Sequence, residues 1–307
     1  MILDQARKDK VFESLLELGK QPEVRLNMTG LPDEAKPYVL AAFDPQEPVV
    51  ILVQDELSAR RWQDDLDFWR PDLNSAIFSA REIQISEATA IDLAPERRRL
   101  VTLTQWLQKV INILIIPAPA LLQILPPPEL LAKRARRYEV GDLIDPMELR
   151  EQLAESGYAY ASRADSSGEY AARGDIVDFV PEPELGEPEV GVRVSFFDTE
   201  IDQIRLFNTD TQRGEEVVDH FVISPLREIM LSGEKREALA LTLEKRAQSI
   251  RREILKKAGS LEDANAFEAL YLRDAERLRE DLNFPAIDRY LSLIYPEQTS
   301  ILDYVSQ

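Results

Sequence analysis

The first part of the chain alternates between short apolar runs and longer segments whose apolar residues follow a helical period. The run Val49–Val53 is largely β-branched, which is typical of a central strand in a parallel sheet. Such patterns predict strands at 48–54, 76–78 and 111–116 and helices at 56–69 and 95–110. The residues expected on the buried face of the first of these helices are Leu57, Trp62, Leu66 and Trp69. The alternation predicts a parallel sheet with helices on both faces.

The middle of the chain has the shorter period of antiparallel strands. We interpret residues 169–180 as one β-segment, which ends at the Pro/Glu/Gly-rich run 181–187. Alternating residues predict a hairpin over 192–206 with a tight turn at Asp198-Thr199, so that one face is core and the other carries the arginines. Before it, Asp145 has the features of a helix N-cap and Gly157 those of a left-handed helix end.

The two ends of the chain are expected to belong with the parallel sheet. Residues 2–19 predict a helix, residues 23–28 a strand, and residues 33–43 a helix. Near the other end we predict a strand at 217–223 that returns to the parallel sheet, helices at 233–257 and 262–281, and a last strand at 300–305. The seam of the first long helix is Leu239, Leu243, Ile250 and Ile254.

A proline-rich segment at 117–130 interrupts both helix and sheet and indicates a domain boundary. We therefore predict an α/β protein in which residues 1–121 and 213–307 form a degenerate RecA/P-loop-like domain. Residues 122–212 form a smaller inserted α/β domain. At 307 residues, the chain is long enough for about two such domains.

Charge argues against autonomous nucleic-acid binding. The formal net charge is −19, from 37 Lys+Arg and 56 Asp+Glu residues, which repels phosphate backbones at long range. We expect little or no DNA binding by this chain alone. The clearest basic run, 133–137, is either a local anion-binding patch or the solvated end of a helix that begins near Pro128.

Several classes of chemistry lack the residues they need. The chain has no cysteine, so no disulfide or thiolate metal site can form, and this composition fits the cytoplasm. His220 is its one histidine, which excludes histidine-based triads and paired-histidine zinc sites, and we expect it to be structural. We expect no signal peptide, no membrane span, no catalytic residues, no metal and no cofactor.

The loop that precedes the 33–43 helix keeps the spacing of a phosphate loop but not its chemistry. Gly30 and Lys36 occupy the first glycine and the lysine positions of G-x-x-x-x-G-K-[ST]. However, Ala35 replaces the second glycine and Pro37 replaces the hydroxyl residue that would hold Mg²⁺. The loop is either the relic of a nucleotide site or a plain strand-loop-helix connection, and both predict no ATP binding.

A resemblance rests on the order of residues around the predicted hairpin. The chain reads E-Y-x-x-R-G-D-I-x-D over 169–178, then V-R-V-x-F-F-D-x-E-I-D-x-I-R-x-F over 192–207, followed by Thr211-Gln212-Arg213. This resembles the UvrB-homology region of the bacterial transcription-repair coupling factors (Mfd). Weaker similarity extends to Phe78–Glu82 and to residues 290–304.

The resemblance implies that the small domain binds UvrA, the damage-recognition ATPase of nucleotide excision repair. By position, the partner-binding residues would be Arg173, Arg193 and Phe197, and strand alternation places Phe197 on the face of Arg193. Two positions depart from the family pattern, because Ser195 stands where an acidic residue is usual and Ala159 where an arginine is often found. Each change removes one charged contact.

Alternatives stay open for these residues and for the function. Arg173 could instead stabilise its own domain by pairing with Asp175 or Asp178, and Phe197 could be a core residue. The preferred hypothesis is a non-catalytic module that recruits UvrA by mimicking UvrB and restrains the motor of a full-length protein, which also has an RNA polymerase-binding module. The alternative is an ATP-dependent DNA enzyme that retains a nucleotide site through Lys36. A UvrB fragment is disfavoured, since UvrB keeps an intact phosphate loop.

Overall fold

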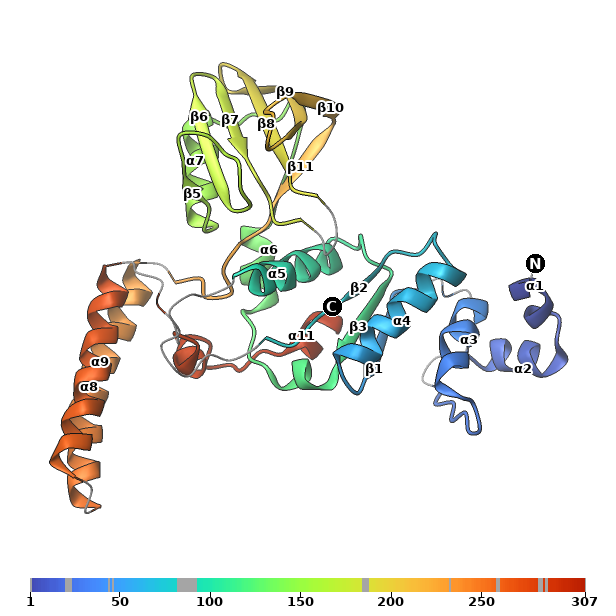
Figure 1. Cartoon of the computed structure of the whole chain (residues 1–307), viewed down its shortest axis with the longest axis horizontal. Helices are drawn as coiled ribbons and strands as arrows, with labels where there is room; N and C mark the ends of the chain where they lie inside the picture. Colours follow the sequence, from blue (N-terminus) through green and yellow to red (C-terminus); the bar gives the residue numbers. More distant parts are fainter. Residues whose placement is uncertain are drawn as a thin grey trace. The chain divides into compact units, whose positions relative to one another are not determined.

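The structure is a computed structural model of an α/β protein (Figure 1). It describes residues 2–19, 24–43, 45, 47–81, 93–183, 188–231, 233–257, 260–280, 284 and 287–306. These form two compact units. The first contains Met1–Ala80, Arg98–Gln123 and Ile301–Gln307, and the second contains Arg81–Arg97 and Ile124–Ser300.

The first unit contains a parallel sheet of three strands in the order β1-β3-β2. Its strands and main helices are β1 (Val49–Val53), α4 (Glu56–Trp69), β2 (Ser75–Ile77), most of α5 (Ala94–Leu107), β3 (Ile113–Pro117) and η2 (Ala118–Leu122). The predicted parallel strands and helices are confirmed, but β3 and not β1 is central. All five β3 residues are buried, whereas Leu52 of β1 is exposed. On α4, Leu66 is buried as predicted, but Leu57 is exposed.

The terminal elements of this unit differ from the predictions. The predicted N-terminal helix is two helices, because Asp9 caps a second one by accepting a 2.9 Å hydrogen bond from Val11 N. The helices before β1 are α1 (Ile2–Arg7), α2 (Lys10–Gly19), η1 (Asp33–Ala35) and α3 (Lys36–Phe43). Residues 24–28 have no regular secondary structure, and residue 23 lies outside the described residues. The predicted last strand is instead the helix α11 (Ile301–Val305), whose Tyr304 carbonyl accepts a 3.1 Å bond from Trp106 Nε1.

The second unit is built around a six-stranded sheet in the order β10-β9-β8-β7-β6-β5. Its strands are β5 (Ala159–Tyr160), β6 (Glu169–Arg173), β7 (Ile176–Phe179), β8 (Val190–Phe197), β9 (Glu200–Asn208) and β10 (Gly214–Val218). The β8–β9 hairpin is confirmed, with its turn at Asp198-Thr199. The single β-segment predicted over 169–180 is wrong. It is an antiparallel pair, β6 and β7, joined at Gly174, whose φ of +58° favours glycine. Residues 184–187 of the run after it lie outside the described residues.

The strand predicted over 217–223 is also wrong. Its first part belongs to β10, which pairs with β9, and its second part is β11 (His220–Ile223). β11 pairs antiparallel with β4 (Arg136–Glu139) in a two-stranded ribbon, so neither part joins the parallel sheet. His220 is exposed at the start of this ribbon. Local apolar content could not distinguish these pairings, because it does not specify the partner strand.

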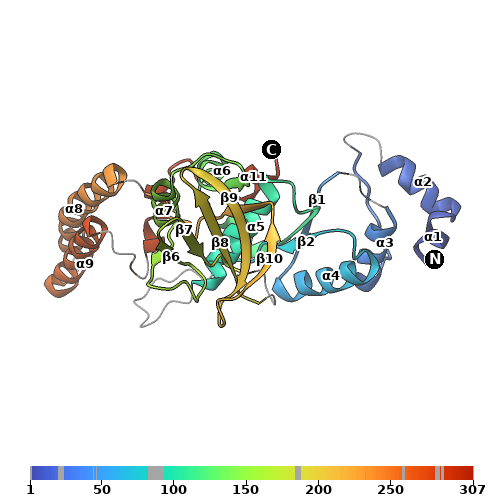
Figure 2. The same cartoon turned by 90° about the horizontal axis from the view of Figure 1, so that it is seen from above.

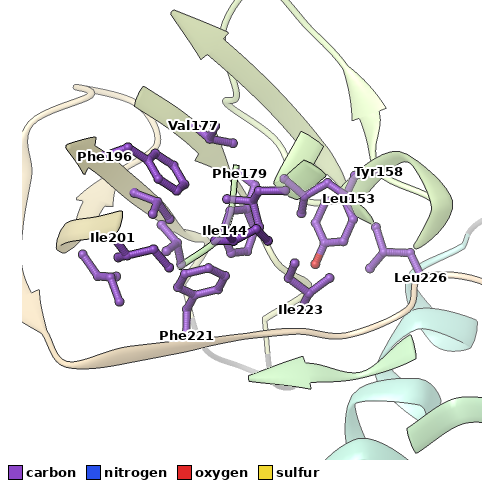
Figure 3. Packing of buried hydrophobic residues seen from close by; sticks show 14 residues of the cluster. Ile144, Leu153, Tyr158, Val177, Phe179, Phe196, Ile201, Phe221, Ile223 and Leu226 are labelled. Atoms are coloured by element: carbon purple, nitrogen blue, oxygen red, sulfur yellow. The ribbon is translucent and has the colours of Figure 1, made fainter. Parts of the chain in front are cut away.

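One face of the six-stranded sheet lies against a hydrophobic core. The helix α7 (Pro146–Glu155) packs on it, capped as predicted by Asp145 and ended by Gly157, whose φ is +97°. Figure 3 shows side chains from α7, the sheet and β11 meeting in one cluster. Within it, the rings of Tyr158 and Phe179 are 5.8 Å apart, and those of Phe179 and Phe221 are 5.4 Å apart.

Two long helices, α8 (Gly233–Lys256) and α9 (Leu261–Arg279), lie side by side in both views (Figures 1 and 2). The predicted seam is confirmed, with Leu239 and Leu243 buried and Ile250 and Ile254 half-buried. The remaining helices are α6 (Pro128–Arg134), η3 (Ile287–Tyr290) and α10 (Leu291–Ile294). The basic run 133–137 is divided between the end of α6 and the beginning of β4. Residue 281, the predicted end of α9, lies outside the described residues.

Candidate functional site

The six-stranded sheet has a second face, opposite the α7 core, and this face is the candidate site. On β8, Val192, Val194 and Phe196 are buried in the core, so alternation points the residues between them to the other side. Directly opposed residues of antiparallel neighbours share a face. We call this surface the open face; its residues are Arg173, Ile176, Asp178, Arg193, Ser195, Phe197, Gln203 and Arg205. The prediction that the arginines lie opposite the core is confirmed.

A one-residue bulge interrupts the β8–β9 ladder near the end of the hairpin. Ser195 pairs with Gln203, but Phe196 pairs with Ile201, so Asp202 is an extra residue on β9. The extra residue allows Ile201 and Ile204, three positions apart, to be buried on the same face. β8 itself alternates without interruption, and Phe197 therefore stays on the side of Arg193.

Arg193 is held in place by its own sheet. Its Nε and Nη2 atoms donate to the two carboxylate oxygens of Asp178 at 2.8 and 2.7 Å. Its guanidinium carbon lies 5.0 Å from the centre of the Phe207 ring. The hydrogen bonds to Asp178 raise the pKa of Arg193 above its usual value. The bidentate pair uses two of the five N–H donors of the guanidinium, and the side chain remains partly exposed.

Arg173 is exposed at the end of β6, immediately before the Gly174 turn. Its Nη2 donates to the carbonyl of Ser162 at 2.9 Å. Within the described part of the chain, it forms no ion pair with Asp175 or Asp178, the two partners considered from the sequence. Asp178 is instead the partner of Arg193. Arg173 thus keeps its charge available at the surface.

Phe197 is 78% exposed, which excludes the interpretation of this side chain as a core residue. It ends β8 beside the turn at Asp198, whose φ is +60°. A large aromatic side chain at this exposure is a typical component of a protein-binding surface.

Ser195 and Ala159 occupy different parts of the sheet. Ser195 is half-buried on the open face, in the row that contains Arg173, Ile176 and Gln203. Ala159 begins the edge strand β5 and is paired with Glu169. A carboxylate at position 195 would lie beside Arg193 on the same face of β8, in the row that contains Arg173.

The structure assigns contacts to residues around the arginines that the sequence did not predict. Asp178 was considered as a partner for Arg173, and its bond to Arg193 requires the β7–β8 register. Arg205 lies opposite Arg193 and donates its Nε to Gln203 Oε1 at 2.6 Å. Ile176 and Val217 are exposed apolar side chains on the neighbouring strands. Alternation within β9 was the signal that could have identified Arg205.

The loop at Gly30 and Lys36 belongs to the first unit, whereas the open face belongs to the second. Gly30 has a φ of +75°, and Lys36 is the first residue of α3. The Nζ atom of Lys36 donates to Asp33 Oδ1, and this bond lowers the pKa of Asp33. The lysine at the phosphate-contacting position is therefore paired with a neighbouring carboxylate at the surface.

Two further observations concern the described residues alone. They contain no group of three or more His, Cys, Asp or Glu side chains placed to hold a metal ion. None of their helices combines the length and apolarity needed to cross a membrane.

Comparison with known proteins identifies the segment that contains the open face. Residues 137–228 match the family model of the UvrB interaction domain. This segment runs from β4 to beyond β11 and includes every residue of the open face. The resemblance stated from the sequence is thereby supported at the segment that carries it.

Whole-chain relatives agree with the domain match. The transcription-repair-coupling factor of Bacillus subtilis is 28% identical over 279 residues, covering 90% of this chain and 23% of the relative. Those of Staphylococcus haemolyticus and Staphylococcus aureus (strain MRSA252) are each 25% identical, covering 100% and 97% of this chain. The chain spans about a quarter of the length of these relatives. The resemblance to the transcription-repair coupling factors is confirmed.

Proposed function

We propose that this chain is a non-catalytic module of transcription-coupled nucleotide excision repair, and that its open face recruits UvrA as UvrB does. The observation that carries the proposal is the position of Arg173, Arg193 and Phe197. They come from two strands that are not neighbours, yet they share one accessible sheet face inside the UvrB interaction domain match.

The chemistry of the open face suits a protein partner with carboxylates around an apolar pocket. Arg173 offers an accessible guanidinium, and Arg193 offers one whose orientation Asp178 already holds. A pre-oriented guanidinium loses less conformational entropy on binding than a free one. Phe197 supplies a large apolar area beside these cations.

The relatives extend far beyond the length of this chain, and their name indicates coupling of repair to transcription. We propose that, in a full-length protein, the module is joined to an RNA polymerase-binding module and a DNA-translocating motor. There it restrains the motor until UvrA is engaged. We place this function in the cytoplasm, and we do not assign an ATP-dependent activity to this chain because Ala35 and Pro37 replace the second glycine and the hydroxyl residue of a phosphate loop.

Calorimetric titration of the chain with purified UvrA tests the proposal. We expect Arg173→Ala, Arg193→Ala and Phe197→Ala each to weaken binding by about tenfold or more, the range of interface hot spots. Asp178→Asn should also weaken binding, because it leaves Arg193 in place but loosens its orientation. Each variant is checked for an unchanged circular dichroism spectrum.

Arg137→Ala is the matched control. Arg137 is an exposed arginine in the same matched segment, but it lies on the β4–β11 ribbon and pairs with Glu139. It should bind UvrA as the unchanged chain does. Absence of binding by the unchanged chain would overturn the recruitment role, whereas equal binding by all variants would move the interface away from the open face.

A further inference from the structure

The second half of α8 concentrates positive charge in an otherwise acidic chain. Residues 245–257, which include the one residue after the helix end at Lys256, carry one acidic residue, Glu253, and six basic ones. The basic residues are all exposed: Lys245, Arg246, Arg251, Arg252, Lys256 and Lys257. The chain as a whole has a formal net charge of −19, so this segment is a local reversal of sign.

Three of these cations form a straight line on one side of the helix. At 100° per residue, Lys245, Arg252 and Lys256 fall within an arc of about 40° and extend over about 16 Å. Gln248 and Ser249 lie between them, and together with Glu253 these residues line a hollow of about 260 Å³. We call Lys245, Arg252 and Lys256 the α8 basic stripe.

The stripe residues differ from the neighbouring arginines in their partners. Arg246 pairs with Glu253 at 3.2 Å, and Arg251 pairs with Glu268 of α9 at 3.3 Å. Within the described residues, the three stripe cations form no ion pair. The helix dipole favours cations only in the last turn, which accounts for Lys256 but not for Lys245 or Arg252.

The residues that line the hollow indicate the class of molecule that the stripe contacts. The hollow is lined by lysine, arginine, glutamine and serine side chains, which are usual donors to nucleic-acid phosphates, and by Glu253, whose charge is paired with Arg246. No aromatic or large apolar side chain lines the hollow, whereas the centre of a protein interface is enriched in such residues. A length of about 16 Å corresponds to about five base pairs of one duplex strand.

We propose that the α8 basic stripe contacts the phosphate backbone of duplex DNA. The low DNA affinity expected from the net charge applies to the chain as a whole, while the stripe provides one local, salt-sensitive contact. Because the acidic remainder repels phosphate, this contact orients the duplex along α8. The proposal is independent of UvrA binding, since α8 lies outside the UvrB interaction domain match.

Fluorescence anisotropy of a labelled duplex of about 20 base pairs, at about 20 mM salt, tests this contact. The test variant is Lys245→Gln/Arg252→Gln/Lys256→Gln, which keeps good helix formers. It should weaken binding at least tenfold and reduce the slope of log affinity against log salt by about 2 to 3, as expected for three phosphate contacts.

The matched control is Lys8→Gln/Lys10→Gln/Arg60→Gln. It removes three exposed cations elsewhere and gives the same change in net charge, from −19 to −22. It should bind DNA within about threefold of the unchanged chain. Equal losses in both variants, or no binding by the unchanged chain, would overturn the proposal. Self-association in sedimentation that only the test variant abolishes would assign the stripe to a second copy of the chain instead.

Discussion

At the scale of single residues, the open face depends on a close contact on the same side of the sheet. Gly191 lies opposite Phe207 in the β8–β9 ladder, and the Phe207 ring occupies the space where a side chain of residue 191 would be. Phe207 is completely buried among Ala164, Ala171 and Val180. The same ring lies under the guanidinium of Arg193, so this contact supports a proposed partner-binding residue.

Replacing Gly191 with alanine should therefore be strongly destabilising. The added Cβ would lie between 2.1 and 2.5 Å from three atoms of the Phe207 ring, which cannot retreat. We expect Gly191→Ala to lower the free energy of unfolding by about 2–3 kcal/mol in urea titration. Gly214→Ala is the control, because its Cβ would meet Arg205 Cδ at 3.6 Å, and it should change stability by less than about 0.5 kcal/mol.

A second variant makes the steric cause testable. Phe207→Leu removes the clashing ring atoms, so Gly191→Ala should cost less when it is introduced into Phe207→Leu than into the unchanged chain. Equal costs in the two backgrounds would contradict the clash.

The sequence predicted where the open-face residues lie on their strands, but not which contacts they make. Alternation over 192–197 was sufficient to place Arg193 and Phe197 on one face. The pairing of Arg193 with Asp178 depends on the β7–β8 register, and the contact of Arg173 with Ser162 depends on where the segment before β6 lies. Neither is encoded in a local pattern.

At the scale of elements, a buried carboxylate attaches α9 to η3. Asp274 is fully buried, and its Oδ2 accepts a 2.7 Å hydrogen bond from the hydroxyl of Tyr290. Arg277 and Arg289 approach the same carboxylate only to 3.8 Å. Burial and the bond to Asp274 raise the pKa of Tyr290, so the hydroxyl remains a donor at neutral pH.

Tyr290→Phe should loosen this attachment. It leaves a buried carboxylate without its shortest hydrogen bond, which we expect to lower the free energy of unfolding by about 1–2 kcal/mol. Tyr271→Phe is the control, because its ring lies 6.0 Å from that of Tyr290 and its hydroxyl has no hydrogen bond within the described residues. Equal stability of the two variants in thermal unfolding would show that Asp274 does not need Tyr290.

Elements with strong local signals were predicted well. The cap at Asp145, the stop at Gly157 and the turn at Asp198 each have a residue type that favours the observed conformation. The turn at Gly174 was missed because apolar residues two positions away on each side, Ala172 and Ile176, continue the strand pattern across the polar residues next to it. The segment 300–305 was predicted as a strand because it is short and largely apolar, and such runs do not distinguish strand from helix.

At the scale of the whole molecule, the α/β class and the parallel sheet were predictable because the period changes regularly along the first unit. Which sheet each later strand joins was not, since residues 214–223 pair with β9 and β4, and not with the parallel strands. Tertiary packing therefore decides that residues 214–223 are divided between two sheets.

Thermal unfolding can test whether the chain binds a nucleotide. We expect about 5 mM Mg-ATP to leave the unfolding temperature unchanged, because a ligand raises it only if it binds the native state. Lys36→Ala should behave in the same way. An increase with Mg-ATP that Lys36→Ala abolishes would restore the ATP-dependent alternative.

The ribbon of β4 and β11 brings together the two ends of the segment that contains the open face. Arg136 lies opposite Ile223, and Glu139 lies opposite His220, so the chain enters and leaves the segment through adjacent backbone strands. A segment with neighbouring ends can be transplanted into a host loop with little change in the distance that the host must bridge. Residues 136–223 are therefore a segment that protein engineering can insert into a loop of an unrelated scaffold. The same neighbouring ends suit the transfer of this segment between proteins by gene fusion.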